Sequence, residues 1–108
     1  MNRIVVIGSC NMDIVVLADK RPAAGETIMG NELHIAHGGK GANQAVAAAR
    51  LGAEVTMVGC IGADAYGQMI LENLKENHIN TDYIVTVPDT TTGTAHITLA
   101  EGDNSIIV

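Results

Sequence analysis

The sequence HGGKGANQAVAAARLG, residues 37–52, joins a glycine-rich turn with one lysine to a stretch rich in alanine. From Ala42 onward, small apolar residues recur at the i, i+3, i+4 and i+7 spacing of one helical face. This spacing predicts a helix whose small side chains allow close packing on a sheet. Three glycines, Gly38, Gly39 and Gly41, allow the backbone before the helix to turn sharply and expose its amides. The stretch therefore predicts a turn and helix that organise the rest of the fold.

The turn has features of a ligand site. A helix N-terminus offers unpaired N–H groups and a partial positive charge. Lys40 adds a full charge, and Asn43 adds a donor and an acceptor suited to a hydroxyl group. The turn is not a P-loop, because no Ser or Thr follows the lysine, and it is not a dinucleotide fingerprint, because Gln44 replaces the third glycine. Glycines that serve packing alone remain an equal alternative at this point.

Composition limits the classes of function. The chain has 108 residues, 47% hydrophobic content and a formal net charge of −6, as expected of one globular unit. Its six basic residues are scattered along the chain, so neither nucleic acid nor a membrane surface is an expected partner. No transmembrane run or signal peptide is apparent, which favours a cytoplasmic protein. Cys10 and Cys60 end apolar runs, and we expect both thiols to be buried and reduced.

Polar residues follow the first predicted strand. Residues 4–7 form a β-branched run ended by Gly8, a pattern typical of a strand buried on both faces in the middle of a sheet. Asn11 and Asp13 come directly after it, at the strand end where open α/β sheets bind their ligands. In an extended segment the two side chains point to the same side. A polar turn, in which one of them caps its own backbone, is the alternative.

The remaining patterns predict a core and an excursion from it. Two more strands are predicted, a buried one at residues 55–61 and a short one at residues 83–87. Between them, a helix capped by Asp64 is expected to extend to His78. The sequence stops inside the apolar run 106–108, so we expect a truncated chain. Two segments, residues 14–17 and 27–36, come between the first core strand and the glycine turn and suit an excursion from the core sheet, and residues 94–99 alternate again.

Five short motifs occur along the chain in a fixed order. They are Gly8-Ser9-Cys10-Asn11-Met12-Asp13, Pro22-x-x-Gly25-Glu26-Thr27, Gly38-Gly39-Lys40-Gly41-Ala42-Asn43-Gln44-Ala45, Gly62-x-Asp64-x-x-Gly67 and Thr92-Gly93-x-Ala95. Together they resemble the N-terminal part of the ribokinase-like sugar kinases of the PfkB family. One motif would be weak, but five at matching spacings over the whole chain are specific.

The resemblance implies an α/β fold, a partial ribokinase-like fold in which parallel core strands with flanking helices carry a small β-sheet lid. Residues 1–108 would be the N-terminal part of one domain, with the nucleotide-binding C-terminal half absent. The lid strands would lie near 14–36 and 94–108, as residues 14–17, 27–36, 94–99 and 105–108.

The resemblance also implies a function, the transfer of the ATP γ-phosphate to the primary hydroxyl of D-ribose. The cofactors would be ATP, Mg²⁺ and a monovalent cation such as K⁺, bound mainly outside this chain. The family's Gly-Ala-Gly-Asp run, which carries phosphoryl transfer, does not occur here. No catalytic or metal-binding residue is therefore expected in this chain, and alone it should be inactive. The implied sugar contacts are Asn11, Asp13, Gly38, Gly39, Lys40 and Asn43, with Ala95 and Ile97 closing over the sugar.

Four histidines match no catalytic position of the family and are expected at the surface or at strand edges, namely His34, His37, His78 and His96. Unpaired strand edges, and a lid that resembles a dimer-forming clasp, predict a homodimer or higher oligomer. The alternative function is a non-catalytic module that binds a small polyol or a partner. A reading frame that continues beyond residue 108 to Gly-Ala-Gly-Asp favours the kinase, whereas a native stop codon favours the module.

Overall fold

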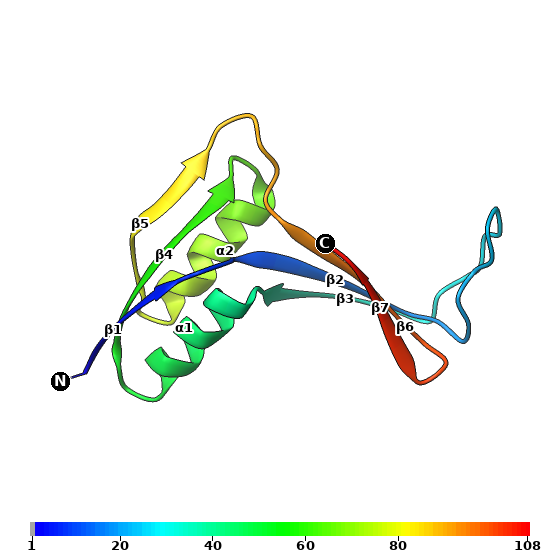
Figure 1. Ribbon diagram of the computed structural model, residues 1–108, viewed down its shortest axis with the longest axis horizontal. Helices are drawn as coiled ribbons and strands as arrows, with labels where there is room; N and C mark the ends of the chain where they lie inside the picture. The colour runs from blue at the N-terminus through cyan, green and yellow to red at the C-terminus, as the bar shows by residue number, and fades with distance from the viewer. Residues whose placement is uncertain (1) are drawn as a thin grey trace.

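Two β-sheets and two helices form the chain in the computed structural model, which describes residues 2–108 (Figure 1). The first sheet, the core, consists of parallel strands β1 (Arg3–Ile7), β4 (Glu54–Gly62) and β5 (Asn80–Val87), in that order. Its helices are α1 (Lys40–Arg50) and α2 (Ala65–Glu76). The second sheet, the lid, has the order β3-β2-β6-β7, with β2 (Asn11–Leu17), β3 (Glu32–Gly38), β6 (Thr94–Ala100) and β7 (Asp103–Ile107). The expected α/β core with a separate lid is thereby confirmed.

The lid extends away from the core, and the chain measures 52 × 33 × 18 Å (Figure 1). The chain leaves the core through β2 and returns through the antiparallel strand β3 to α1. It leaves the core a second time through β6, which runs parallel to β2 because both strands start at the core. The lid is therefore attached through several strand ends at one junction.

Both helices cover the same face of the core sheet. The i, i+3 spacing predicted for α1 is confirmed, since Ala42 and Ala45 are buried on the sheet. In α2, Ile70 and Leu74 are buried one turn apart. Complete burial of a side chain such as Leu74 contributes about 1.5 to 3 kcal/mol. These helical residues form one cluster with alternate residues of β4, namely Val55, Met57 and Ile61.

The opposite face of the core sheet is uncovered within residues 2–108. β1 is an edge strand here, so the prediction of a central strand buried on both faces is wrong for the described chain. Ile7, for example, is 79% exposed. The apolar run of β1 reflects two apolar faces, but only one of them has a partner among these residues. We call the uncovered surface the open face; its members, aligned by strand register, are Val5, Ile7, Val58, Cys60, Tyr83 and Val85.

Several boundaries differ from the sequence prediction. β2 begins at Asn11, so the alternative of a polar turn is wrong. β3 begins at Glu32 rather than residue 27, and α2 ends before His78, whose φ of 60° is incompatible with a continued helix. Cys10 is buried as predicted, but Cys60 is exposed because it belongs to the open face. Both thiols are free, as expected.

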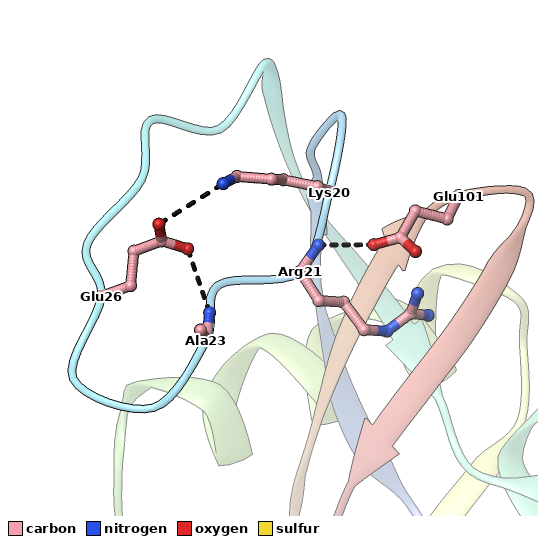
Figure 2. A network of polar contacts seen from close by, with 5 residues as sticks. All are labelled: Lys20, Arg21, Ala23, Glu26 and Glu101. Carbon is pink, nitrogen blue, oxygen red and sulfur yellow. Dashed lines mark hydrogen bonds and ion pairs between the residues drawn. The ribbon is translucent and has the colours of Figure 1, made fainter.

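The loop between β2 and β3 is anchored on the hairpin of β6 and β7 (Figure 2). The Arg21 N–H donates to the Glu101 carboxylate at 2.9 Å. Within the loop, Glu26 accepts hydrogen bonds from the Ala23 N–H at 3.0 Å and from Lys20 Nζ at 3.4 Å. The Arg21 guanidinium donates to three hairpin oxygens, which are Ser105 Oγ at 2.8 Å and the carbonyls of Ala100 and Asp103, both at 3.0 Å.

Candidate functional site

The glycine turn joins the end of β3 to the start of α1. Gly39 precedes the helix with φ 94°, a left-handed conformation that glycine adopts without steric cost. Any side chain there would collide with the segment after β1, because a Cβ would lie 2.5 Å from the Ser9 carbonyl oxygen. That oxygen accepts a hydrogen bond from the Ala42 N–H at 3.0 Å. The turn is thus fixed against the residues that lead into β2.

The first turn of α1 has N–H groups available for a ligand. No side chain caps the helix, and the Asn43 N–H bonds to the Gly39 carbonyl at 2.9 Å. The N–H groups of Lys40 and Gly41 have no acceptor within residues 2–108. Unpaired donors at a helix N-terminus carry partial positive charge and suit an oxygen-rich ligand.

Asn11 and Asp13 lie on one face of β2, as their spacing predicts, and both are half-buried. Asn11 pairs with Gly38 of β3, which is the residue before the glycine turn. The Asp13 carboxylate packs so closely on Gly38 that a Cβ at that glycine would overlap it. On the other side, Asn11 Oδ1 lies 2.6 Å from the place a Cβ of Gly93 would occupy. The structure therefore brings the polar pair and the glycine turn together.

Ala95 and Ile97 of β6 share the face that carries the polar pair. Ala95 pairs with Asp13, and Ile97 pairs with Val15 one step further into the lid. Ala95 is buried and Ile97 is half-buried. In this structure they form an apolar wall beside Asp13, and their closure over a sugar stays a prediction.

Lys40 and Asn43 extend the site onto α1, and both side chains are exposed. Lys40 is the first residue of the helix, directly after the turn. Asn43 borders a shallow groove that His37 and Arg50 also line. Their contact with a ligand stays a prediction.

Sequence reasoning missed a connection between two motifs at the junction of core and lid. Asp64 caps α2 as predicted, accepting a hydrogen bond from the Gly67 N–H at 2.9 Å. The same carboxylate also accepts from Thr92 Oγ at 2.5 Å and from the Thr92 N–H at 2.8 Å. Bonds from Thr92, with that from Gly67, lower the pKa of Asp64 below its ordinary value. Both motifs were visible in the sequence, but their contact spans 28 residues and depends on tertiary structure.

The histidines and cysteines take no part in the contact between Asp64 and Thr92. All four histidines are exposed, in agreement with the sequence prediction. Burial, with a smaller contribution from Cys60, raises the pKa of the Cys10 thiol. Residues 2–108 contain no cluster of three or more His, Cys, Asp or Glu side chains that fits a metal ion. In the same range, neither helix has the length and apolar character needed to cross a membrane.

Comparison with known proteins gives one consistent result. The model of the pfkB family carbohydrate kinase matches residues 1–108. Among curated proteins, ribokinase from Bacillus subtilis is 64% identical over all of this chain and 37% of its own length. Mouse ribokinase is 49% identical over 97% of this chain and 33% of its own length. The chain thus spans about a third of the length of these relatives.

Solved structures agree with the sequence relatives. Arabidopsis thaliana ribokinase, complexed with ribose and ATP, has a TM-score of 0.89 and 40% identity over 98% of this chain and 35% of its own. Ribokinase from Cryptococcus neoformans, in complex with ADP, has a TM-score of 0.84 and 41% identity over 99% of this chain and 34% of its own.

Proposed function

Because this chain belongs to the pfkB family of carbohydrate kinases, we propose that it is the sugar-binding part of a longer, ATP-dependent ribose kinase. The reaction is the transfer of the ATP γ-phosphate to the primary hydroxyl of D-ribose. Supporting observations are the relatives named ribokinase and the solved relative that holds ribose and ATP.

One observation carries the sugar-binding role, namely the position of Asn11 and Asp13 against the glycine turn. A sugar presents several adjacent hydroxyls, each both a donor and an acceptor. The Asp13 carboxylate can accept from two hydroxyls at once, and Asn11 can both donate and accept. The N–H groups of the turn and of the first residues of α1 supply donors that a carboxylate lacks. These groups provide both kinds of hydrogen-bonding partner that a small polyol needs.

The other proposed contacts surround this centre. Gly38 and Gly39 bring backbone close to the sugar because they have no Cβ. Lys40 and Asn43 reach the sugar from α1, and Ala95 and Ile97 form the apolar side that excludes water.

We place phosphoryl transfer in the part of the protein beyond these residues. The sequence has no Gly-Ala-Gly-Asp run, and the described residues offer no metal-binding cluster, so no step through Mg²⁺ or K⁺ is assigned to this chain. Positioning and charge stabilisation supply nearly all the catalysis of phosphoryl transfer. The isolated chain is therefore inactive in this proposal. A cytoplasmic location and a homodimer or higher oligomer, formed through the lid or an exposed sheet edge, belong to the same proposal.

The test compares the complete protein that carries this chain with residues 1–108 alone, both purified free of host kinases. ADP release is measured with D-ribose, 2-deoxyribose and a nucleoside, and with ATP alone as the control. We expect ribose-dependent release by the complete protein and none by residues 1–108. Sugar binding without ADP release by the complete protein would support the non-catalytic polyol-binding module instead.

A further inference from the structure

Thr92 connects the core to the start of the lid strand β6. Its side chain is only 4% exposed, and its hydroxyl makes two hydrogen bonds: it donates to Asp64 and accepts from the Gly62 N–H at 2.9 Å. Gly62 ends β4, and Asp64 caps α2. One buried hydroxyl therefore joins the end of a core strand, the start of a helix and the entry to the lid.

This junction continues directly into the candidate sugar site. Gly93, the next residue, accepts a hydrogen bond from the Met12 N–H at 3.0 Å through its carbonyl oxygen. A Cβ at Gly93 would lie only 2.6 Å from Asn11 Oδ1, so no larger residue fits there. From Gly93 the strand runs on to Ala95, which pairs with Asp13. Thr92 is thus followed directly by the residues of β6 that meet both polar residues of β2.

We propose that Asp64 and Thr92 are a positioning pair that fixes β6 against β2 and so sets the geometry of Asn11 and Asp13 for the sugar. The inference rests on the proposed function, because it assumes that this face binds ribose. Neither residue touches the sugar in this scheme. Their effect passes through Gly93 and the register of the β2–β6 pair.

A helix cap without any role in the sugar site would explain part of the same geometry. The two roles separate at Thr92→Val, which removes the hydroxyl but keeps the side-chain shape. It leaves the cap bond from the Gly67 N–H to Asp64 in place. It also keeps the backbone bond from the Thr92 N–H to Asp64. Only the link through the hydroxyl is lost, together with the acceptor of the Gly62 N–H.

The experiment uses the complete protein with three variants. Thr92→Val removes the link and Thr92→Ser keeps the hydroxyl. Thr91→Val makes the same change at the exposed neighbouring residue. The measurements are the KM values for ribose and ATP, and the hydrogen exchange rate of the Met12 amide, which reports the bond to Gly93 without any sugar.

We expect Thr92→Val to raise the KM for ribose about tenfold, equivalent to roughly 1.4 kcal/mol, with the KM for ATP unchanged. Exchange of the Met12 amide should become faster. Thr92→Ser and Thr91→Val should resemble the parent in both measurements.

Two different results would contradict the positioning role of Asp64 and Thr92 and the proposed kinase function, respectively. If Thr92→Val lowers the melting temperature but changes neither the KM for ribose nor Met12 exchange, the pair is a helix cap alone and the inference is wrong. If the parent protein does not phosphorylate ribose, the proposed function is wrong, and Met12 exchange still decides whether Thr92 positions β6.

Discussion

A carboxylate that packs on a glycine backbone, as Asp13 does on Gly38, is held on one side and leaves its other side for a ligand. Replacing Asp13 by Ala in the complete protein should leave sugar hydroxyls without their acceptor. We expect ribose affinity to fall by about 1.5 to 3 kcal/mol, roughly ten- to a hundredfold, with ATP affinity unchanged. Titration calorimetry with each ligand measures both values.

The matched control is Asp82→Ala, which removes an exposed carboxylate from β5 in the core. It should bind ribose as the parent does. Equal ribose affinity in Asp13→Ala and the parent would mean that Asp13 serves only the packing of β2 on the turn.

Asp64 gives a second prediction for a single residue, which concerns how the stability of the fold changes with pH. Bonds to Thr92 and Gly67 lower its pKa below the ordinary value of 3.8. The folded state therefore binds this proton more weakly than the unfolded state, and the carboxylate stabilises the fold at pH values above 3.8. That stabilisation is lost as the pH falls below 3.8 and through the folded pKa. Asp64→Asn should remove this part of the acid sensitivity.

Thermal melts of the complete protein between pH 5 and pH 2 measure the effect. The Tm of the parent should fall more steeply below pH 4 than that of Asp64→Asn, and the control Asp82→Asn should follow the parent. Parallel curves for all three proteins would show that the Asp64 junction contributes nothing to acid stability.

For single residues, the sequence predicted those features of the site that depend only on neighbouring residues in the chain. Asn11 and Asp13 share a face because they are two residues apart in a strand, and Asp64 is a cap because a helix follows it. The bond between Asp64 and Thr92 was not predictable in this way. It forms only when β4 and β6 are brought to the same junction by the folded chain.

Among the elements, the helices α1 and α2 were predicted within about two residues, because the burial of one face fixes them. The bounds of β1, β4 and β6 were predicted within one residue, whereas β2, β3 and β5 begin three to five residues from their predicted starts. β1 reads as a central strand, yet it lies at the edge of the sheet formed by residues 2–108. The apolar run of β1 shows that both faces of the strand are apolar. The position of β1 in the sheet, however, depends on which other strands pair with it. β3 likewise begins later than its loose alternation predicts, after the loop anchored by Arg21.

That loop supplies a prediction at the level of elements. The Arg21 guanidinium holds the β6–β7 hairpin through three hydrogen bonds with nearly ideal lengths. Arg21→Ala should loosen the hairpin and destabilise the lid by about 1 to 2 kcal/mol, since bonds to a charged donor are the stronger kind. Hydrogen exchange of the β6 and β7 amides in the complete protein should become faster, while exchange in β4 stays as in the parent.

The control is Lys20→Ala, one residue earlier. Lys20 forms an exposed ion pair with Glu26 at 3.4 Å, and such pairs contribute about 0 to 1 kcal/mol. If both variants exchange like the parent, the Arg21 contacts do not stabilise the hairpin.

For the whole molecule, the open face makes the isolated chain different from an ordinary small domain. Both helices cover one face of the core sheet, and the other presents apolar side chains from all three strands to solvent. We propose that the remainder of the longer protein covers this face, in agreement with relatives about three times as long. Residues 1–108 alone would expose the apolar surface and the strand edges beside it.

We therefore expect residues 1–108 to form a dimer or a higher oligomer in solution at micromolar concentration. Ile7→Glu places a charge on the open face and should weaken this association at least tenfold, because burying an isoleucine contributes about 1.5 to 3 kcal/mol. Leu51→Glu is the matched control, since Leu51 is 89% exposed after α1, outside the open face. Light scattering across a dilution series measures the masses. A monomer that melts cooperatively would show that the chain tolerates its open face, whereas oligomers equally stable in all three proteins would place the contact on the lid.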